Sequence, residues 1–294
     1  MQERANELKE EVRTIIKSAT DTFERMNLID TIGRLGIGYH FEKEINEVLT
    51  SLNDAKFGSN NKLIHEVALR FRLLRQHGFH VSADEFLKFK DDKGGFSSIV
   101  SEDARGLLSL YNAASLGTDG EDILKEASFF TKERLEYLVH DLEYPLKNQV
   151  SRALQIPLPR MMKRLEARWY IDEYKEENPN DIILELATLD FDIVQALHRE
   201  ELRIVSLWWN ELNLKENFGY TRDRIVESFF WMTGVYFEPH FSRARIIATK
   251  AFNLITLLDD TYDIYGTLEE CQLLTDAIQR FLSPVIAAPW ENAT

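Results

Sequence analysis

An acidic cluster near the end of the sequence contains the residues best suited to chemistry. Asp259 and Asp263 are four positions apart, so on a helix their carboxylates lie on one face, about one turn apart. Like charges at this spacing repel each other, and no Lys or Arg occurs between Ala251 and Arg280 to compensate them. Carboxylate oxygens in this arrangement suit Mg²⁺, with Mn²⁺ as the alternative. A solvated helix end with an aspartate as its cap explains the same spacing equally well.

Two arginines upstream of the cluster supply the complementary charge. Arg222 and Arg224 flank Asp223, and a guanidinium binds phosphate oxygens through two parallel hydrogen bonds. Aromatic residues accompany both motifs, among them Trp231 and Tyr262. A site for a diphosphate with a hydrocarbon tail needs a metal face, arginines and an aromatic wall together. Each part alone also fits a structural explanation, as a solvated charge pair at a helix start or as core packing.

The composition excludes several classes of function. The sequence has 35 basic and 49 acidic residues, and 35 − 49 gives a net charge of −14, which argues against a nucleic-acid partner. Cys271 is the only cysteine, which excludes an intrachain disulfide and a cysteine-rich zinc site. No apolar run approaches the ~20 residues of a membrane-spanning helix, so no membrane partner is expected. The first residues lack the features of a leader peptide, which predicts a cytoplasmic protein.

The elements that must position these residues are helices. Apolar residues recur at spacings of three and four positions in 60–77, 121–142 and 181–214. The first segment shows the same pattern, for example at Leu8 and Val12. Sustained strand-like alternation is absent, and 13 Gly and 7 Pro provide little turn chemistry. The sequence therefore predicts an all-α fold.

A polar, proline-containing stretch over residues 175–180 predicts a domain boundary. It divides the chain into two helical domains, 1–178 and 179–294. In the second domain the segments 228–237 and 251–258 are apolar on more than one face, which predicts buried helices. Such helices need neighbours, and few residues follow them to supply any.

These blocks together resemble the plant class I terpene synthases. Residues 257–269 match the family's DDxxD motif in the form typical of plant enzymes, Leu-Leu-Asp-Asp-Thr-Tyr-Asp-Ile-Tyr-Gly-Thr-Leu-Glu. Residues 220–224 resemble the RxR element, and 237–242 match a block between the two motifs. Three further segments resemble the helical N-terminal domain of plant sesquiterpene synthases: residues 32–42, 71–79 and 119–124. The resemblance covers about residues 5–280. It implies a helical N-terminal domain followed by a partial class I isoprenoid synthase α-bundle.

The resemblance also implies a reaction. Such an enzyme uses Mg²⁺ to ionise farnesyl diphosphate and releases a sesquiterpene and diphosphate, with geranyl diphosphate as the alternative substrate. Asp259 and Asp263 would bind the metal that holds the diphosphate, and Asp260 would support them as a further catalytic carboxylate. The protein is expected to be a monomer.

The remaining site residues take their roles from the same resemblance. Arg222 and Arg224 would hold the diphosphate as it leaves. Trp231 and Tyr262 would border the substrate cavity, where their π faces stabilise a passing carbocation. These four residues complete the predicted substrate-binding set with Asp259 and Asp263.

The sequence departs from the family pattern after Arg280. Family members continue through most of a further helical bundle, which contains the second metal motif of the NSE/DTE type. Residues 281–294 match no part of it, and Pro284 and Pro289 predict that the helix ends there. We therefore expect a synthase truncated at its C-terminus that does not cyclise a prenyl diphosphate.

Two other functions remain open. A non-catalytic helical pseudo-enzyme or interaction module is favoured by the absence of the second metal motif, whereas the intact Asp259–Asp263 cluster favours an enzyme. A chain-elongating prenyltransferase would share an aspartate-rich motif but would normally show two of them, and the sequence has one. By family resemblance the leading prediction is a sesquiterpene synthase.

Overall fold

Helices make up almost all of the regular structure of the protein. The computed structural model describes residues 1–54, 63–96, 102–177 and 179–286. Within these ranges, strand-like pairing is limited to one isolated antiparallel bridge between Lys90 and Phe96. The predicted all-α fold is therefore confirmed. The chain divides into two compact units, Met1–Val194 (unit 1) and Gln195–Thr294 (unit 2).

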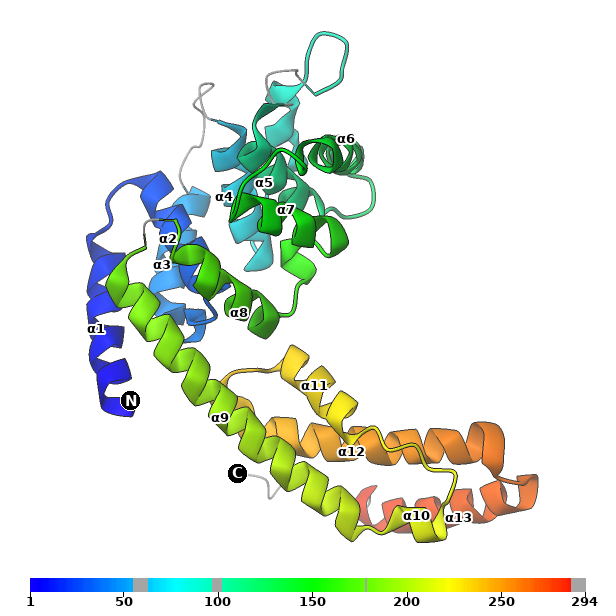
Figure 1. Cartoon of the computed structure of the whole chain (residues 1–294). Helices are drawn as coiled ribbons and strands as arrows, with labels where there is room; N and C mark the ends of the chain where they lie inside the picture. The colour runs from blue at the N-terminus through cyan, green and yellow to red at the C-terminus, as the bar shows by residue number, and fades with distance from the viewer. Residues whose placement is uncertain (55–62, 97–101, 178, 287–294) are drawn as a thin grey trace. The chain divides into compact units, whose positions relative to one another are not determined.

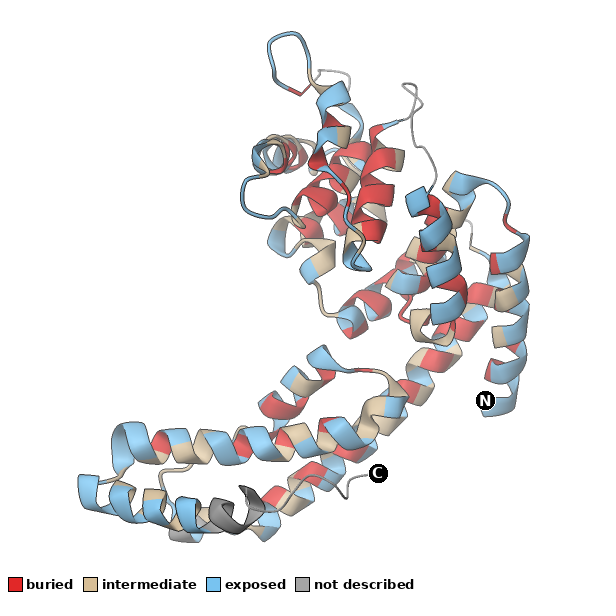
Figure 2. Cartoon of the chain, turned by 180° about the vertical axis from the view of Figure 1, so that it is seen from behind, coloured by how far each residue is buried: buried red, intermediate tan, exposed pale blue. Residues whose placement is uncertain are grey.

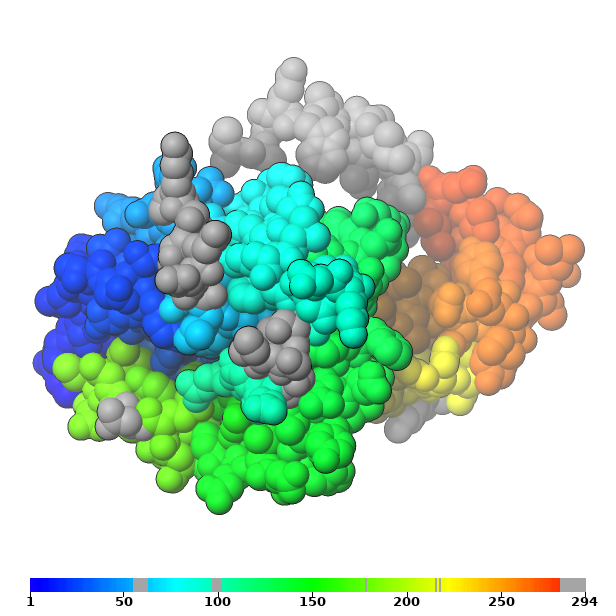
Figure 3. Space-filling view, turned by 90° about the horizontal axis from the view of Figure 1, so that it is seen from above, coloured from blue at the N-terminus to red at the C-terminus, as the bar shows by residue number. Residues whose placement is uncertain are grey.

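Unit 1 is a set of short helices around a buried centre. Its helices are α1 (Gln2–Ser18), α2 (Thr22–Arg34), α3 (Glu42–Asp54), α4 (Ile64–Gln76), α5 (Ala104–Ala114), α6 (Asp122–Leu138), α7 (Leu146–Gln155), α8 (Lys163–Tyr174) and the first half of α9 (Asp181–Glu211) (Figure 1). Helices α4 and α5 pack most extensively against each other. Every residue of α4 from Val67 to Leu74 is buried, so this helix lies inside the unit (Figure 2). The space-filling view shows the blue, cyan and green segments of unit 1 packed against one another (Figure 3).

The outer helices of unit 1 follow the predicted amphipathic pattern. Helix α1 buries Leu8, Val12 and Ile16 on one face, and its charged residues lie on the other. Asp21 caps helix α2, because its carboxylate accepts the backbone N–H groups of Phe23 and Glu24. Asp103 caps α5 in the same way by accepting from a backbone N–H at 2.9 Å. Local sequence therefore sets where these helices begin and which face they bury.

Helix α9 begins at the end of the stretch that predicted a domain boundary. Asn180 caps it, because its side-chain oxygen accepts the backbone N–H of Ile183 at 3.2 Å. The first half of α9 still packs in unit 1, where Ile183 and Leu186 belong to the core. The compact units divide inside the helix, after Val194. The polar stretch thus ends one helix and caps the next, and the division after residue 178 stays a prediction.

Unit 2 contains the end of α9 and the helices that carry the acidic cluster. These are α10 (Leu214–Asn217), α11 (Ile225–Val235), α12 (Ser242–Asp260), the π-helical turn Thr261–Tyr265 and α13 (Leu268–Ile286). A small apolar core joins α9 to α11 through Val205, Trp209, Ile225 and Phe229. Helices α11 and α12 make the most extensive contact between elements of this unit.

The prediction that segments 228–237 and 251–258 are buried helices is wrong. Both are largely helical, but Trp231 is 41% exposed and Ile255 is 59% exposed. Helix α12 instead turns a polar face inward, which carries Arg245 and Thr249. Apolar composition predicted burial, whereas the inward face is held by hydrogen bonds and an ion pair that the composition does not reveal.

The expected helix break after Arg280 is also placed wrongly. Helix α13 continues to Ile286, so Pro284 lies within its last turn. Proline has a backbone angle compatible with a helix, so its presence alone does not decide where the helix ends. Pro289 lies outside the described residues. None of the described helices combines the length and apolar character needed to cross a membrane.

Candidate functional site

The acidic cluster lies where α12 changes its helical winding. Asp259 and Asp260 are the last residues of α12, and Asp263 follows within the π-helical turn. The backbone N–H of Gly266 donates to the Thr261 carbonyl at 2.7 Å, a bond over five positions that widens the turn. Asp259 and Asp263 are exposed, whereas Asp260 is buried. The three aspartates therefore have different environments, although the sequence places them side by side.

Asp260 is bound by Arg222 in a two-pronged ion pair. The Arg222 Nε donates to Asp260 Oδ2 at 2.9 Å, and one terminal nitrogen donates to Oδ1. The hydrogen bonds from Arg222 lower the pKa of Asp260, so this carboxylate stays ionised below its ordinary range. The same contact raises the pKa of Arg222. Among the described residues no partner is recorded for the other terminal nitrogen of Arg222, which keeps two N–H donors available.

Tyr220 fixes the segment that carries the arginines to the acidic cluster. The Thr261 hydroxyl donates to the Leu257 carbonyl at 2.8 Å, so in its 2.9 Å contact with Tyr220 it is the acceptor. The Tyr220 ring also stacks on Tyr265, with ring centroids 4.6 Å apart. Together with the ion pair of Arg222, these contacts hold residues 220–222 against the end of α12.

Three predicted residues remain available at this end of α12. Asp259 and Asp263 are exposed, and no ion pair of either is recorded within the described ranges. Arg224 is half-buried directly before α11, and its charge also helps to lower the pKa of Asp260. The described part of the chain contains no group of three or more His, Cys, Asp or Glu residues that could hold a metal ion. Two exposed carboxylates nevertheless suit Mg²⁺, which keeps several waters and shares phosphate oxygens.

The two predicted aromatic residues lie in different surroundings. Trp231 on α11 meets Phe252 of α12 edge to face, with ring centroids 5.3 Å apart. Tyr262 lies against α13, where the Thr275 hydroxyl donates to the Cys271 carbonyl at 2.8 Å and therefore accepts from the Tyr262 hydroxyl, also at 2.8 Å. Trp231 therefore forms part of an aromatic pair on α11 and α12, whereas Tyr262 joins the π-helical turn to α13. The sequence did not indicate Phe252 as the partner of Trp231.

Arg245 is the main structural residue of unit 2 that the sequence did not reveal. It is fully buried, and its Nε and one terminal nitrogen donate to Glu201 of α9 at 2.7 and 2.8 Å. The remaining nitrogen donates to the carbonyls of Tyr236 and Glu238. One side chain thus ties α12 to α9 and to the connection that follows α11. The only sequence signal is the polar stripe that Thr249 continues one turn further along α12.

The Asp260–Arg222 pair has a testable pH dependence. The folded pKa of Asp260 lies below its ordinary value of about 3.9, so the pair stabilises unit 2 above that pH. Its contribution is lost as the pH falls through the lowered folded pKa. We expect Asp260→Asn to lower the melting temperature by a few degrees at pH 6, and the difference from wild type to shrink below about pH 3.9.

Thermal melts followed by circular dichroism at several pH values measure this difference. Asp276→Asn, an exposed aspartate of α13, is the matched control and should melt like wild type at each pH. A difference between Asp260→Asn and wild type that does not change with pH would contradict the assignment.

Comparison with known proteins identifies the family. The profile of the terpene synthase N-terminal domain matches residues 1–154, and that of the terpene synthase metal binding domain matches residues 210–288. Beta-cubebene synthase from Magnolia grandiflora is 50% identical over 281 residues, which cover 95% of this chain and 51% of that protein. (S)-beta-bisabolene synthase from Zingiber officinale is 51% identical over 286 residues, which cover 96% of this chain and 51% of that protein.

A solved structure agrees with these relatives. Isoprene synthase from grey poplar leaves matches with a TM-score of 0.88 and 40% identity, covering 98% of this chain and 55% of that one. A second structure of that enzyme, which holds three Mg²⁺ ions and dimethylallyl-S-thiolodiphosphate, gives a TM-score of 0.87 and covers 98% of this chain and 56% of that one. The chain spans about half the length of the relatives it matches. Since the profiles of both terpene synthase domains match the chain, it belongs to the terpene synthase family.

Proposed function

We propose that this chain carries the first metal- and diphosphate-binding face of a sesquiterpene synthase that acts on farnesyl diphosphate. The observation that carries the proposal is the end of α12, where Asp259 and Asp263 are exposed beside the Arg222–Asp260 ion pair. The sesquiterpene synthase of Cananga odorata, which is 45% identical over 280 residues, supports this substrate class. Geranyl diphosphate is the alternative substrate.

The residues at this site would divide the work of binding the diphosphate. Asp259 and Asp263 would hold Mg²⁺, or Mn²⁺ as the alternative, through their carboxylate oxygens. The bound metal would neutralise the charge that develops on the diphosphate as it leaves. Arg222, oriented by Asp260, would donate its remaining N–H groups to phosphate oxygens, and Arg224 would add a second positive charge.

The hydrocarbon part of the substrate needs an apolar surface that excludes water. The aromatic pair of Trp231 and Phe252 supports placing that surface on α11 and α12, where a π face can stabilise a carbocation. Trp231 is 41% exposed and Phe252 is 37% exposed. A cation formed beside them would therefore meet water before it could cyclise.

The same exposed side chains favour a second candidate, a non-catalytic interaction module. Contiguous apolar surface on a folded protein marks sites that bind other molecules. Exposed apolar side chains on α11 and α12 include Val226, Phe230, Val235 and Ile255. The two candidate functions differ in one property, because only a synthase requires metal-dependent binding of a prenyl diphosphate.

Calorimetric titration of the 294-residue chain with farnesyl diphosphate tests the proposal. We expect binding with Mg²⁺ present and at least tenfold weaker binding when the metal is chelated, because the aspartates repel an uncompensated diphosphate. Product analysis by gas chromatography should show no cyclic sesquiterpene above background. Binding of equal strength with and without Mg²⁺, or no binding at all, would refute the proposed site. The non-catalytic interaction module would then be the remaining candidate. A cyclic product would contradict the expectation that water reaches a carbocation beside the exposed Trp231 and Phe252.

A further inference from the structure

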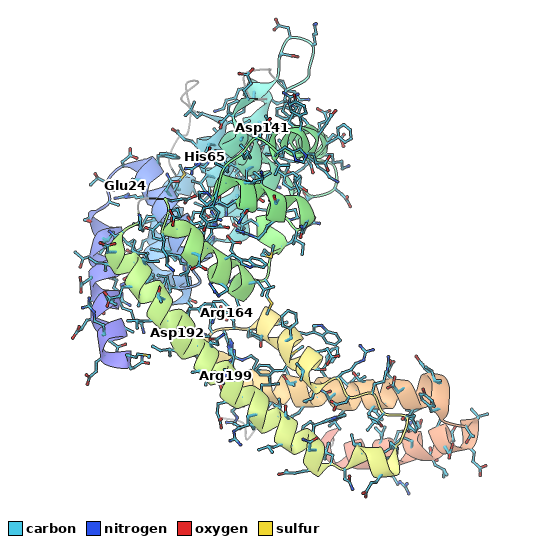
Figure 4. The ribbon with its side chains drawn as sticks, viewed as in Figure 1. Glu24, His65, Asp141, Arg164, Asp192 and Arg199 are labelled. Carbon is cyan, nitrogen blue, oxygen red and sulfur yellow. The ribbon has the colours of Figure 1, made fainter. Side chains whose placement is uncertain are left out.

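Unit 1 contains a polar cavity that has no part in the proposed reaction. Its volume is about 280 Å³, and residues of α2, α4, α5, α7 and α8 line it. The lining includes the arginines Arg34, Arg72, Arg105 and Arg152. His65, which is labelled in Figure 4, also belongs to the lining. A cavity of this size admits a small metabolite, and its walls are charged where a core cavity would be apolar.

Most of the charge in this lining is already neutralised. Arg34 donates to Glu166 at 2.8 Å, and Arg72 donates to Asp30 at 2.7 Å. Arg34 and Arg72 are therefore held by carboxylates within unit 1, whereas Glu177, which also lines the cavity, has its one ion pair recorded in the described part of the chain with Arg105.

Arg105 is the exception among the four arginines. Its one recorded ion pair within the described residues is with Glu177 at 3.7 Å, which is too long for a hydrogen bond. Glu177 does not depend on that contact, because Gln149 donates to it at 3.0 Å and the Tyr170 hydroxyl at 3.4 Å. Within the described ranges, the Arg105 guanidinium that lines the cavity therefore has no recorded hydrogen bond.

One further nitrogen atom in the lining, Nε of Arg152, is a buried donor that lacks an acceptor within the described structure. Arg152 binds Glu173 through its terminal nitrogens, and its Nε is buried without a hydrogen-bond partner. His65 uses Nδ1 in a 2.6 Å contact with Ser109 Oγ, and no contact of Nε2 is recorded. Buried donors are normally satisfied, so an acceptor at this position would remove an energetic cost.

We propose that the cavity of unit 1 binds a small anion with a phosphate or carboxylate group, held mainly by Arg105 with support from His65 and Arg152. A guanidinium fork matches the paired oxygens of both groups. The site lies wholly in unit 1, so it is independent of the acidic cluster of unit 2 and of the proposed reaction.

The electrostatics of His65 provide a reporter for this site. Burial lowers the pKa of His65, and the positive charge of Arg105 and Arg72 lowers it further. Asp30 and Asp103 act in the opposite direction. An anion bound beside Arg105 cancels part of the positive field, so the pKa of His65 should rise when the cavity is filled.

The experiment titrates the full chain with inorganic phosphate and, separately, with citrate at constant ionic strength. Calorimetry measures binding, and the imidazole resonances of ¹³C-labelled histidine report the pKa of His65, assigned with His65→Asn. We expect saturable binding of at least one anion and a higher pKa for His65 in its presence. The two anions distinguish a phosphate site from a carboxylate site.

Two variants distinguish specific binding in the cavity from non-specific attraction of anions to the positive charges of the protein. Arg105→Gln should weaken binding roughly tenfold, the loss expected for one charge-assisted contact. The Arg105 side chain is 61% exposed, so this change should leave the melting temperature unchanged. Arg168→Gln, an exposed arginine of α8 paired with Asp172, should bind like wild type. Absence of saturable binding, or equal binding by Arg105→Gln and Arg168→Gln, would overturn the proposal and leave a cavity that holds only water.

Discussion

Replacing Arg245 with methionine is expected to destabilise unit 2 by about 3–5 kcal/mol, the cost of breaking a buried ion pair by removing one partner. Arg245 is fully buried, and Glu201 is 1% exposed, so the remaining carboxylate would lie uncompensated in the interior. The carbonyl groups of Tyr236 and Glu238 would also lose their donor. Hydrogen–deuterium exchange of peptides from α9, α11 and α12 assigns the loss to unit 2.

The sequence offers a matched control two positions away on the same helix, on a different face. Arg243 is exposed near the start of α12, so the Arg243→Met variant should show the same hydrogen–deuterium exchange as wild type. Replacing both partners, as in Glu201→Leu with Arg245→Met, should recover part of the stability because no buried charge remains. If Arg245→Met and Arg243→Met had equal effects, the ion pair would not be what holds these helices together.

Substituting Asp263 by asparagine should have the largest effect on ligand binding. The change removes a negatively charged oxygen ligand, and Mg²⁺ is held mainly by such ligands. We expect Asp259→Asn and Asp263→Asn each to weaken Mg²⁺-dependent binding of farnesyl diphosphate at least tenfold in calorimetric titrations. Both aspartates are exposed, so neither change should lower the melting temperature.

Two further variants show whether the loss is specific. Asp276→Asn removes a charge from α13 outside the cluster and should bind like wild type. Asp260→Asn should instead act through Arg222, which would lose the carboxylate that orients it. Binding by Asp263→Asn that equals that of Asp276→Asn would mean that the metal is held elsewhere.

Much of the fold follows from local sequence. The spacing of Leu8, Val12 and Ile16 predicted the buried face of α1, and polar caps such as Asp21 mark where helices begin. These features depend on residues within a few positions of one another, so a single sequence reveals them. The resemblance to terpene synthases rested on similarly short motifs and is confirmed by the family comparison.

The prediction that two segments of unit 2 are buried failed because burial depends on contacts between distant positions. Segments 228–237 and 251–258 were expected to be buried because they are apolar, yet Trp231 and Ile255 are substantially exposed. Which face of a helix is buried depends on the helices that pack against it, and composition does not specify those neighbours. The ion pair between Arg245 and Glu201, 44 positions apart, turned the polar face of α12 inward instead.

For the candidate site, the sequence by itself determined the residue types: a row of carboxylates with arginines and aromatic residues upstream. Only the tertiary structure decided their partners. It pairs Arg222 with Asp260, 38 positions away, leaves Asp259 and Asp263 exposed, and places Tyr262 against α13. The physical reason is that a motif fixes chemistry and spacing along one helix, whereas burial and charge neutralisation depend on the segments that fold against it.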